Sequence, residues 1–203
     1  VCFLPRPNSP SGVVCPIETV ERLCRESNGI VVIDEAYVDF AEDSCLDFPK
    51  RFENAMVMRT FSKSFSLAGM RLGVTVARPE LIAEFMKVKD SYNLDAVTQA
   101  VGLAAIQDYD WMLANAQKVR ATRTRLVQDL QKLGFHVPSS HANFVLAQWT
   151  GTPSAKEIFK ALRDRAIIVR YFDMPRLQDK LRITVGTDEE VGALLAALSE
   201  MLR

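Results

Sequence analysis

The sequence has no excess of basic residues: 25 lysines and arginines balance 25 aspartates and glutamates, and the formal net charge is zero. Nucleic-acid-binding proteins usually concentrate basic residues on one face, so this balance argues against a nucleic-acid partner. Long apolar runs are also missing. Runs such as Gly29 to Ile33 have the length of a strand and fall far short of the roughly 18 residues that cross a bilayer. We therefore expect neither nucleic acid nor a membrane among the partners.

Cysteine and histidine are scarce, with four and two residues. The cysteines all lie in the first quarter of the chain and match no zinc-ligand spacing and no CxxC pair. A disulfide framework in a chain of this length would usually spread its cysteines, so we expect reduced thiols and a cytoplasmic protein. His136 and His141 have no cysteine or carboxylate cluster beside them, so no metal site is expected.

Alternating strand and helix patterns fill the first half of the chain. Ile30 to Ile33 is a continuous β-branched run, which is typical of a parallel strand buried on both faces. Apolar residues at helical spacing predict an amphipathic helix from Ile17 to Ser27. Further strands are predicted at 1–4, 55–59 and 72–77. Strands separated by helices indicate parallel βαβ units and therefore an α/β domain.

The second half of the chain has a different pattern of predicted elements. Good helix formers predict helices from about 79 to 133, with breaks near 90–94 and 108–110 and Gly134 as the C-cap. Later strands are predicted at 135–138, 143–147, 167–170 and 181–185, and later helices at 154–165 and 188–202. These elements indicate a smaller α+β domain. We expect residues 1–108 to belong to a large domain, and residues 109–203, including the bridging helix, to form the small one.

A lysine among small hydroxyl residues follows the strand predicted at 55–59. Lys63 lies between this strand and a glycine-bearing turn, whereas surface lysines usually sit among other charges on a helix. If its surroundings depress its pKa, the neutral amine can form a Schiff base with a carbonyl group. Thr60, Ser62 and Arg71 can donate hydrogen bonds to a phosphate. The alternative is a purely structural hydroxyl-rich turn, and an ordinary P-loop is excluded because GxxxxGK[ST] is absent.

An aspartate ends the predicted buried strand at 30–33. Asp34 is either a helix cap or satisfied core acid, or a carboxylate that pairs with a protonated ring nitrogen of a cofactor. Tyr37, three residues further on, is near enough to reach the same site. Ligands of open α/β sheets bind at the carboxyl ends of the strands, and this is where both polar clusters fall.

Together these motifs resemble the fold type I pyridoxal-phosphate aminotransferases of class II, and they are most similar to the histidinol-phosphate aminotransferase family. The matching segments, in the family's order, are Asp34–Phe40, Arg59–Lys63, Leu67–Gly73 and Leu181–Thr187. The resemblance covers essentially the whole chain. It implies an α/β fold: an aminotransferase-like large-domain portion with a mainly parallel sheet, plus a small C-terminal α+β domain.

The resemblance also implies an activity. It is pyridoxal-phosphate-dependent transamination between histidinol phosphate or imidazole acetol phosphate and glutamate or 2-oxoglutarate, in histidine biosynthesis and in a homodimer. Lys63 would form the Schiff base with the cofactor and then act as the base. Asp34 would pair with the pyridine nitrogen, and Tyr37 would hydrogen-bond the phenolic oxygen. The residues that would hold the cofactor's phosphate are Thr60, Ser62 and Arg71.

The resemblance to the family also implies roles for four further residues. Arg182 matches the arginine that binds the substrate's anionic end, which in the case of glutamate is the α-carboxylate. Arg170 resembles a second anion-binding arginine, for the substrate phosphate, or is a surface arginine at a strand end. Asn143 is a substrate-side or backbone-positioning residue. Ser9 stands where the family commonly has the asparagine of Asn-Pro-Thr-Gly; it keeps a donor toward the phenolic oxygen but is shorter, which leaves that contact open.

Two other interpretations remain. One is a different fold type I enzyme, such as an aromatic aminotransferase or an amino-acid phosphate decarboxylase. The other is a truncated, non-catalytic homologue that binds the cofactor poorly. Val1 to Leu4 resembles the middle of a buried strand, and the family's members are longer, so we expect the chain to lack the N-terminal part of the family's fold.

Overall fold

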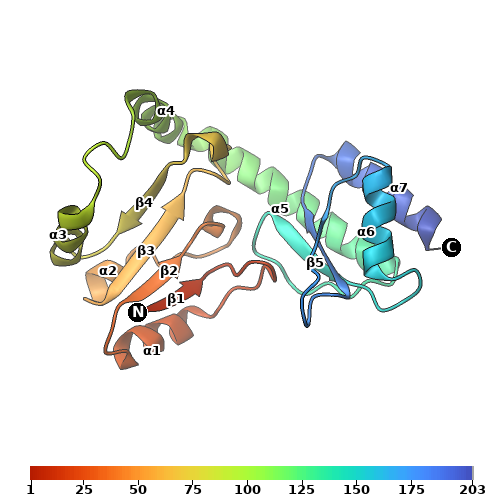
Figure 1. Cartoon of the computed structure of the whole chain (residues 1–203), viewed down its shortest axis with the longest axis horizontal. Coiled ribbons are helices and arrows are strands. Elements are labelled where there is room, and N and C mark those ends of the chain that lie inside the picture. The colour runs from red at the N-terminus through yellow and green to blue at the C-terminus, as the bar shows by residue number, and fades with distance from the viewer. Residues whose placement is uncertain (203) are drawn as a thin grey trace. The chain divides into compact units, whose positions relative to one another are not determined.

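The computed structural model describes residues 1–202 and divides the chain into two units (Figure 1). The first unit comprises Val1–Asn8 and Val14–Ala116. The second comprises Ser9–Val13 and the residues from Gln117 onward. The division expected between residues 108 and 109 falls inside the first unit and stays a prediction. No helix in the described part of the chain is long and apolar enough to cross a membrane.

A four-stranded sheet organises the first unit, in the order β1-β2-β3-β4. β1, β2 and β3 are parallel, whereas β4 runs antiparallel to β3 (Figure 1). The reversal follows from the connection, because β3 reaches β4 through a turn and the short helix η2 (Ala68–Met70) without a crossover helix. The predicted mainly parallel sheet is therefore confirmed. The strands are β1 (Cys2–Pro5), β2 (Val31–Asp34), β3 (Ala55–Thr60) and β4 (Gly73–Val76).

Helix α1 covers part of this sheet with the face that its apolar spacing predicts. Val20 and Cys24 of α1 are buried in one cluster with Val31, Ile33 and Val57 of the strands. The long helical stretch breaks where expected, and the Asp95 carboxylate caps the second piece by accepting the Thr98 amide hydrogen at 2.9 Å. The helices that begin in this unit are α1 (Ile17–Glu26), η1 (Val38–Phe40), α2 (Phe48–Arg51), α3 (Pro79–Val88), α4 (Ala96–Gln107) and α5 (Tyr109–Lys132).

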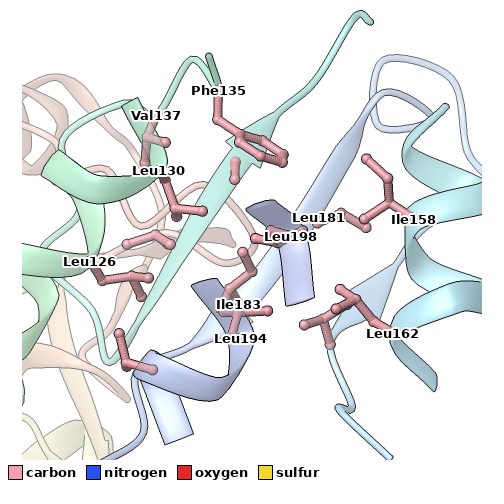
Figure 2. Close-up of a cluster of buried hydrophobic side chains, with 14 of the residues drawn as sticks. Leu126, Leu130, Phe135, Val137, Ile158, Leu162, Leu181, Ile183, Leu194 and Leu198 are labelled. Carbon is pink, nitrogen blue, oxygen red and sulfur yellow. The ribbon is translucent and has the colours of Figure 1, made fainter. Parts of the chain in front are cut away.

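The second unit is an antiparallel three-stranded sheet with helices, as the α+β prediction requires. The strand order is β5-β7-β6, so the last strand lies between the two earlier ones. Leu181 and Ile183 of β7 point into a core that α5, α6 and α7 complete (Figure 2). Ser154 and Thr187 begin α6 and α7 with capping boxes. The elements are β5 (Phe144–Gln148), α6 (Ala155–Asp164), β6 (Arg170–Tyr171), β7 (Lys180–Thr184) and α7 (Asp188–Met201).

Two predicted strands of this unit are wrong in extent. The stretch 135–138 contributes only a single bridge, between His136 and Gln148, because Pro138 has no amide hydrogen with which to extend a ladder. The stretch 167–170 joins the sheet only at Arg170. The amide of Ile167 instead donates to the carbonyl oxygen of Leu162, which completes the exit from α6.

Candidate active site

A hollow of about 360 Å³ opens at the carboxyl ends of β2 and β3. Five of the predicted cofactor residues line this hollow, and all five belong to the first unit. Tyr37 is a sixth neighbour, because its ring centroid lies 5.4 Å from the Lys63 Nζ atom. The residues lining the hollow are Asp34, Ala36, Met58, Arg59, Thr60, Ser62, Lys63, Ala68 and Arg71.

A tight excursion of the chain between β3 and β4 presents Lys63. The amide of Phe61 donates to the carbonyl oxygen of Leu72, and the amide of Leu67 donates to that of Phe61, so both ends of the excursion are tied. The Lys63 side chain is exposed. It forms no ion pair with a carboxylate within residues 1–202, so its amine is available for chemistry.

Asp34 holds the turn that follows β2 and also lines the hollow. Its Oδ1 atom accepts the Ala36 amide hydrogen at 2.9 Å, which fixes the turn after β2. The side chain is only half-buried and lines the hollow. The same carboxylate therefore holds the local backbone and remains at the surface of the hollow.

Side chains that can donate hydrogen bonds to an anion lie near both ends of the segment between β3 and β4. The Thr60 Oγ1 atom accepts the Ser62 amide hydrogen at 3.1 Å, which places two hydroxyl side chains at the start of the excursion. Arg71 has φ +54°, a left-handed conformation that costs a non-glycine residue about 1 kcal/mol. Its guanidinium donates to the carbonyl oxygen of Ala68 at 2.8 Å and remains exposed at the hollow. Such local strain is commonly found at ligand sites.

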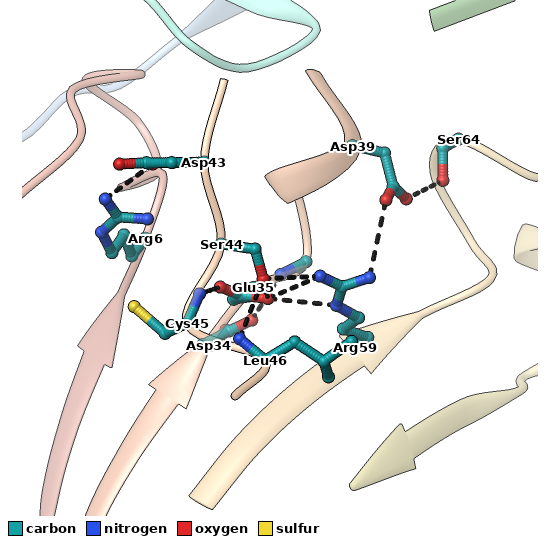
Figure 3. A network of polar contacts seen from close by, with 11 residues as sticks. Arg6, Asp34, Glu35, Asp39, Asp43, Ser44, Cys45, Leu46, Arg59 and Ser64 are labelled. Atoms are coloured by element: carbon teal, nitrogen blue, oxygen red, sulfur yellow. Dashed lines mark hydrogen bonds and ion pairs between the residues drawn. The ribbon is translucent and has the colours of Figure 1, made fainter. Parts of the chain in front are cut away.

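The sequence analysis did not single out a polar network beside this hollow. Glu35 is 1% exposed, and its carboxylate accepts hydrogen bonds from Arg59, Ser44 and the amide of Cys45 (Figure 3). An acid next to Asp34 in a buried segment requires a cation partner. The position of Glu35 in a buried segment could therefore have predicted that it pairs with a basic residue. The sequence does not say which of the many basic residues is the partner.

A second group of predicted residues lies in the second unit. Arg182 on β7 has its guanidinium carbon 5.0 Å from the ring centroid of Phe144 and 5.7 Å from that of Phe172. Its Nη1 atom donates to the Ser9 hydroxyl at 3.1 Å, while its Nε atom is buried without a hydrogen-bond partner. Arg170 is the direct neighbour of Arg182 across the β6–β7 pair and is exposed.

Asn143 acts on the backbone in this structure. Its carbonyl oxygen accepts the Val185 amide hydrogen at 2.9 Å, which continues the pairing of β5 with β7 by one step. The side chain is half-buried. Among residues 1–202, no group of three or more His, Cys, Asp or Glu side chains is placed to hold a metal ion.

Comparisons with known proteins identify the family of this chain. Residues 1–198 match the family model "Aminotransferase class I and II". Histidinol-phosphate aminotransferase 1 of Nostoc sp. is 50% identical over 202 residues, and that of Trichormus variabilis is 48% identical over 203 residues. Each match covers 100% of this chain, but only 57% and 58% of the respective relative, so the chain spans little more than half their length.

A solved structure gives the same result for the fold. Histidinol-phosphate aminotransferase from Sinorhizobium meliloti, in complex with pyridoxal-5'-phosphate, is 26% identical and superposes with a TM-score of 0.86. The match covers 99% of this chain and 56% of that one. Because the family model covers nearly the whole chain, and the sheet and motifs agree with it, this chain belongs to the class I and II aminotransferase family.

Proposed function

We propose that this chain provides the catalytic residues for a pyridoxal-phosphate-dependent transamination between histidinol phosphate and 2-oxoglutarate, or the reverse reaction from imidazole acetol phosphate and glutamate. The observation that carries the proposal is the gathering of Lys63, Asp34 and Arg71 around one hollow. The names of the relatives that are about 50% identical support this choice of substrates.

The residues around the hollow fit pyridoxal phosphate by their chemistry. They offer an amine for its aldehyde, a carboxylate for its ring nitrogen, and hydroxyl and guanidinium donors for its phosphate. When bound, pyridoxal phosphate withdraws electrons from the substrate's α-carbon. Lys63 supplies the amine that holds the cofactor and then moves the α-proton, Asp34 keeps the ring nitrogen protonated, and Tyr37 donates to the phenolic oxygen.

The arginines of the second unit serve the substrate. Arg182 binds the α-carboxylate of glutamate, and Arg170 binds the phosphate of histidinol phosphate. The support is electrostatic: the two guanidiniums are cross-strand neighbours, and within residues 1–202 neither forms an ion pair with a carboxylate. Asn143 holds the strand that faces Arg182. The contact of Ser9 with the cofactor's phenolic oxygen stays a prediction, and its hydroxyl is an acceptor for Arg182.

We also propose a cytoplasmic homodimer. Its support is a set of large apolar side chains on α4 and the start of α5 that remain exposed in the described chain, namely Val97, Leu103, Ile106 and Trp111. Light scattering of the full-length protein after size exclusion should give twice the mass of one chain. A monomer at micromolar concentration would contradict this assembly.

The proposed reaction is tested on the full-length protein with added pyridoxal phosphate. We expect a visible absorption band that disappears in Lys63→Ala and persists in Lys50→Ala, a change of another exposed lysine of the same unit. Glutamate-dependent amino transfer to imidazole acetol phosphate should fall by at least about 10³-fold in Lys63→Ala. An unchanged band in that variant would refute the role of Lys63.

Three further outcomes separate the alternatives. Release of carbon dioxide without amino transfer would indicate the decarboxylase. A preference for aromatic amino donors over glutamate would indicate an aromatic aminotransferase. Failure of the wild-type protein to bind the cofactor would indicate a non-catalytic homologue.

A further inference from the structure

A buried ion pair joins the segments that follow β2 and β3. The Glu35 carboxylate has no exposed side-chain surface, and its Oε2 atom accepts from both Nε and Nη2 of Arg59 at 3.0 Å. Ser44 bridges the pair: its hydroxyl donates to Glu35 at 2.9 Å and accepts from Arg59 at 2.8 Å. The Cys45 amide satisfies the other carboxylate oxygen. A buried carboxylate with this many donors holds its surroundings firmly.

The same guanidinium extends the network toward Lys63. The Nη1 atom of Arg59 lies 3.9 Å from Oδ1 of Asp39, and Oδ2 of Asp39 accepts a hydrogen bond from the Ser64 hydroxyl (Figure 3). Ser64 is 7% exposed and directly follows Lys63 in the chain. We call Glu35, Asp39, Ser44, Arg59 and Ser64 the polar brace.

The polar brace begins where the backbone ladder stops. The last paired residues of β2 and β3 are Asp34 and Met58, and the amide of Glu35 makes the final bond, to the carbonyl oxygen of Met58 at 2.8 Å. Tyr37 and Lys63 both lie beyond this point. Strand pairing therefore does not fix their separation, and contacts between side chains of the two segments must do so.

Members of the polar brace are also close neighbours of the site residues along the chain. Glu35 follows Asp34, and Asp39 lies two residues after Tyr37. On the other segment, Arg59 precedes Thr60 and Ser64 follows Lys63. A shift of either segment would therefore move a residue of the site with it.

We propose that Asp39 and Ser64 are positioning residues that hold the Lys63 amine against Tyr37. This inference rests on the proposed function for its catalytic consequence but not for its structural one. Without the Asp39–Ser64 hydrogen bond, the 61–67 excursion keeps its two backbone ties, yet it loses a hydrogen bond to the segment that carries Tyr37. Small misplacements of a catalytic group reduce turnover strongly, up to about 10²-fold for a displacement of about 1 Å.

The test compares Ser64→Ala and Asp39→Ala with Ser44→Ala, all in the full-length protein. Ser44→Ala removes a hydroxyl from the Glu35 side of the polar brace, where its hydrogen bonds join it to Glu35, Arg59 and Leu46 and not to residues 61–67. Two readouts report on position. The first is amide hydrogen exchange of residues 61–67, measured without cofactor. The second is the ratio of circular dichroism to absorbance in the visible band, measured with pyridoxal phosphate. This ratio falls when the bound ring is held less rigidly.

We expect Ser64→Ala and Asp39→Ala to exchange faster over 61–67 by about tenfold. We also expect a lower dichroism ratio, and a kcat reduced by about tenfold with KM nearly unchanged. Ser44→Ala should lower the melting temperature without these effects. Ser64→Thr, which retains the hydroxyl, should restore both readouts.

Unchanged exchange and dichroism in Ser64→Ala and Asp39→Ala would overturn the inference, as would equal opening of 61–67 in Ser44→Ala. If the wild-type protein shows no visible band, the proposed function fails instead. The hydrogen-exchange comparison then still decides whether Asp39 and Ser64 hold the segment.

Discussion

Arg170 and Arg182 are direct partners across the antiparallel pair of β6 and β7. Like charges at such a position destabilise a sheet, which supports the proposal that the two arginines bind an anion. Phe172 lies beside both guanidiniums, at 5.5 Å from Arg170 and 5.7 Å from Arg182, and the ring faces partly offset their repulsion. The role that we propose for the pair is to bind a ligand that carries negative charge.

The two arginines should divide the two half-reactions between them. We expect Arg170→Met to lower kcat/KM for histidinol phosphate by about 10²-fold, and Arg182→Met to do the same for glutamate, since each change removes a hydrogen-bonded ion pair with substrate. Single-turnover kinetics with each substrate measures this. Arg163→Met, on the exposed side of α6, is the matched control. Equal effects of both variants on both substrates would contradict the assignment.

Asp34→Asn should separate the charge of Asp34 from its structural role. The amide oxygen can still accept the Ala36 amide hydrogen, so the melting temperature should barely change. The negative charge beside the cofactor's ring nitrogen is lost, and we expect kcat to fall by about 10²–10³-fold. Asp47→Asn, at an exposed position, controls for loss of one surface charge. Full activity in Asp34→Asn would rule out the ring-nitrogen contact.

The thiol of Cys45 should be inert in the folded protein. Cys45 is fully buried, and burial raises its pKa from an ordinary value of 9.0 to about 12. The thiolate is the reactive form, so iodoacetamide at pH 8 should modify the exposed Cys2 and leave Cys45 unmodified until the protein unfolds. Mass spectrometry of proteolytic peptides measures this, and rapid native labelling of Cys45 would contradict its burial.

The same pKa shift predicts how stability depends on pH. The unfolded thiol loses its proton near pH 9 while the folded thiol keeps it, so the contribution is fully present below pH 9 and declines toward pH 12. We expect the free energy of unfolding to fall across this window by up to about 1.4 kcal/mol per pH unit from this group. Cys45→Ala should reduce the slope in urea titrations at several pH values. An unchanged slope would mean that the folded and unfolded pKa values are equal.

Gly12→Ala should destabilise the second unit. Gly12 has φ +76°, and an added Cβ would lie 2.2 Å from the Ser140 Oγ atom. That hydroxyl is held in place because it donates to the carbonyl oxygen of Phe144 and accepts the Ala142 amide hydrogen. Backbone strain and the clash together should cost about 2 kcal/mol or more in the free energy of unfolding, measured by urea denaturation.

Gly192→Ala in α7 is the control for this substitution. No heavy atom lies within 4 Å of the added Cβ, and alanine favours the helix, so we expect a gain of about 0.5–1 kcal/mol. A loss of stability in Gly12→Ala no larger than the experimental error would show that the turn can relax.

Local patterns in the sequence account for much of the fold. The β-branched run before Asp34 became β2, and the helical spacing of 17–27 became α1 within one residue of its predicted end. Ser154 and Thr187 mark the starts of α6 and α7 because a cap is decided by residues within one turn of each other. The motifs around Lys63 and Arg71 likewise lie within a dozen residues, so the sequence alone sufficed to predict that they share a site.

Pairings between distant residues required the tertiary structure. The position of β7 between β5 and β6 brings Arg182 beside Arg170, and the sequence between them does not specify that order. Arg59 finds Glu35 across 24 positions, and Ser64 finds Asp39 across 25. Residue types and spacing therefore determined the elements and the chemistry of the site, because propensity, capping and motif act over short stretches. The polar brace and the pair of arginines were decided by packing, which selects one partner among many chemically equivalent side chains.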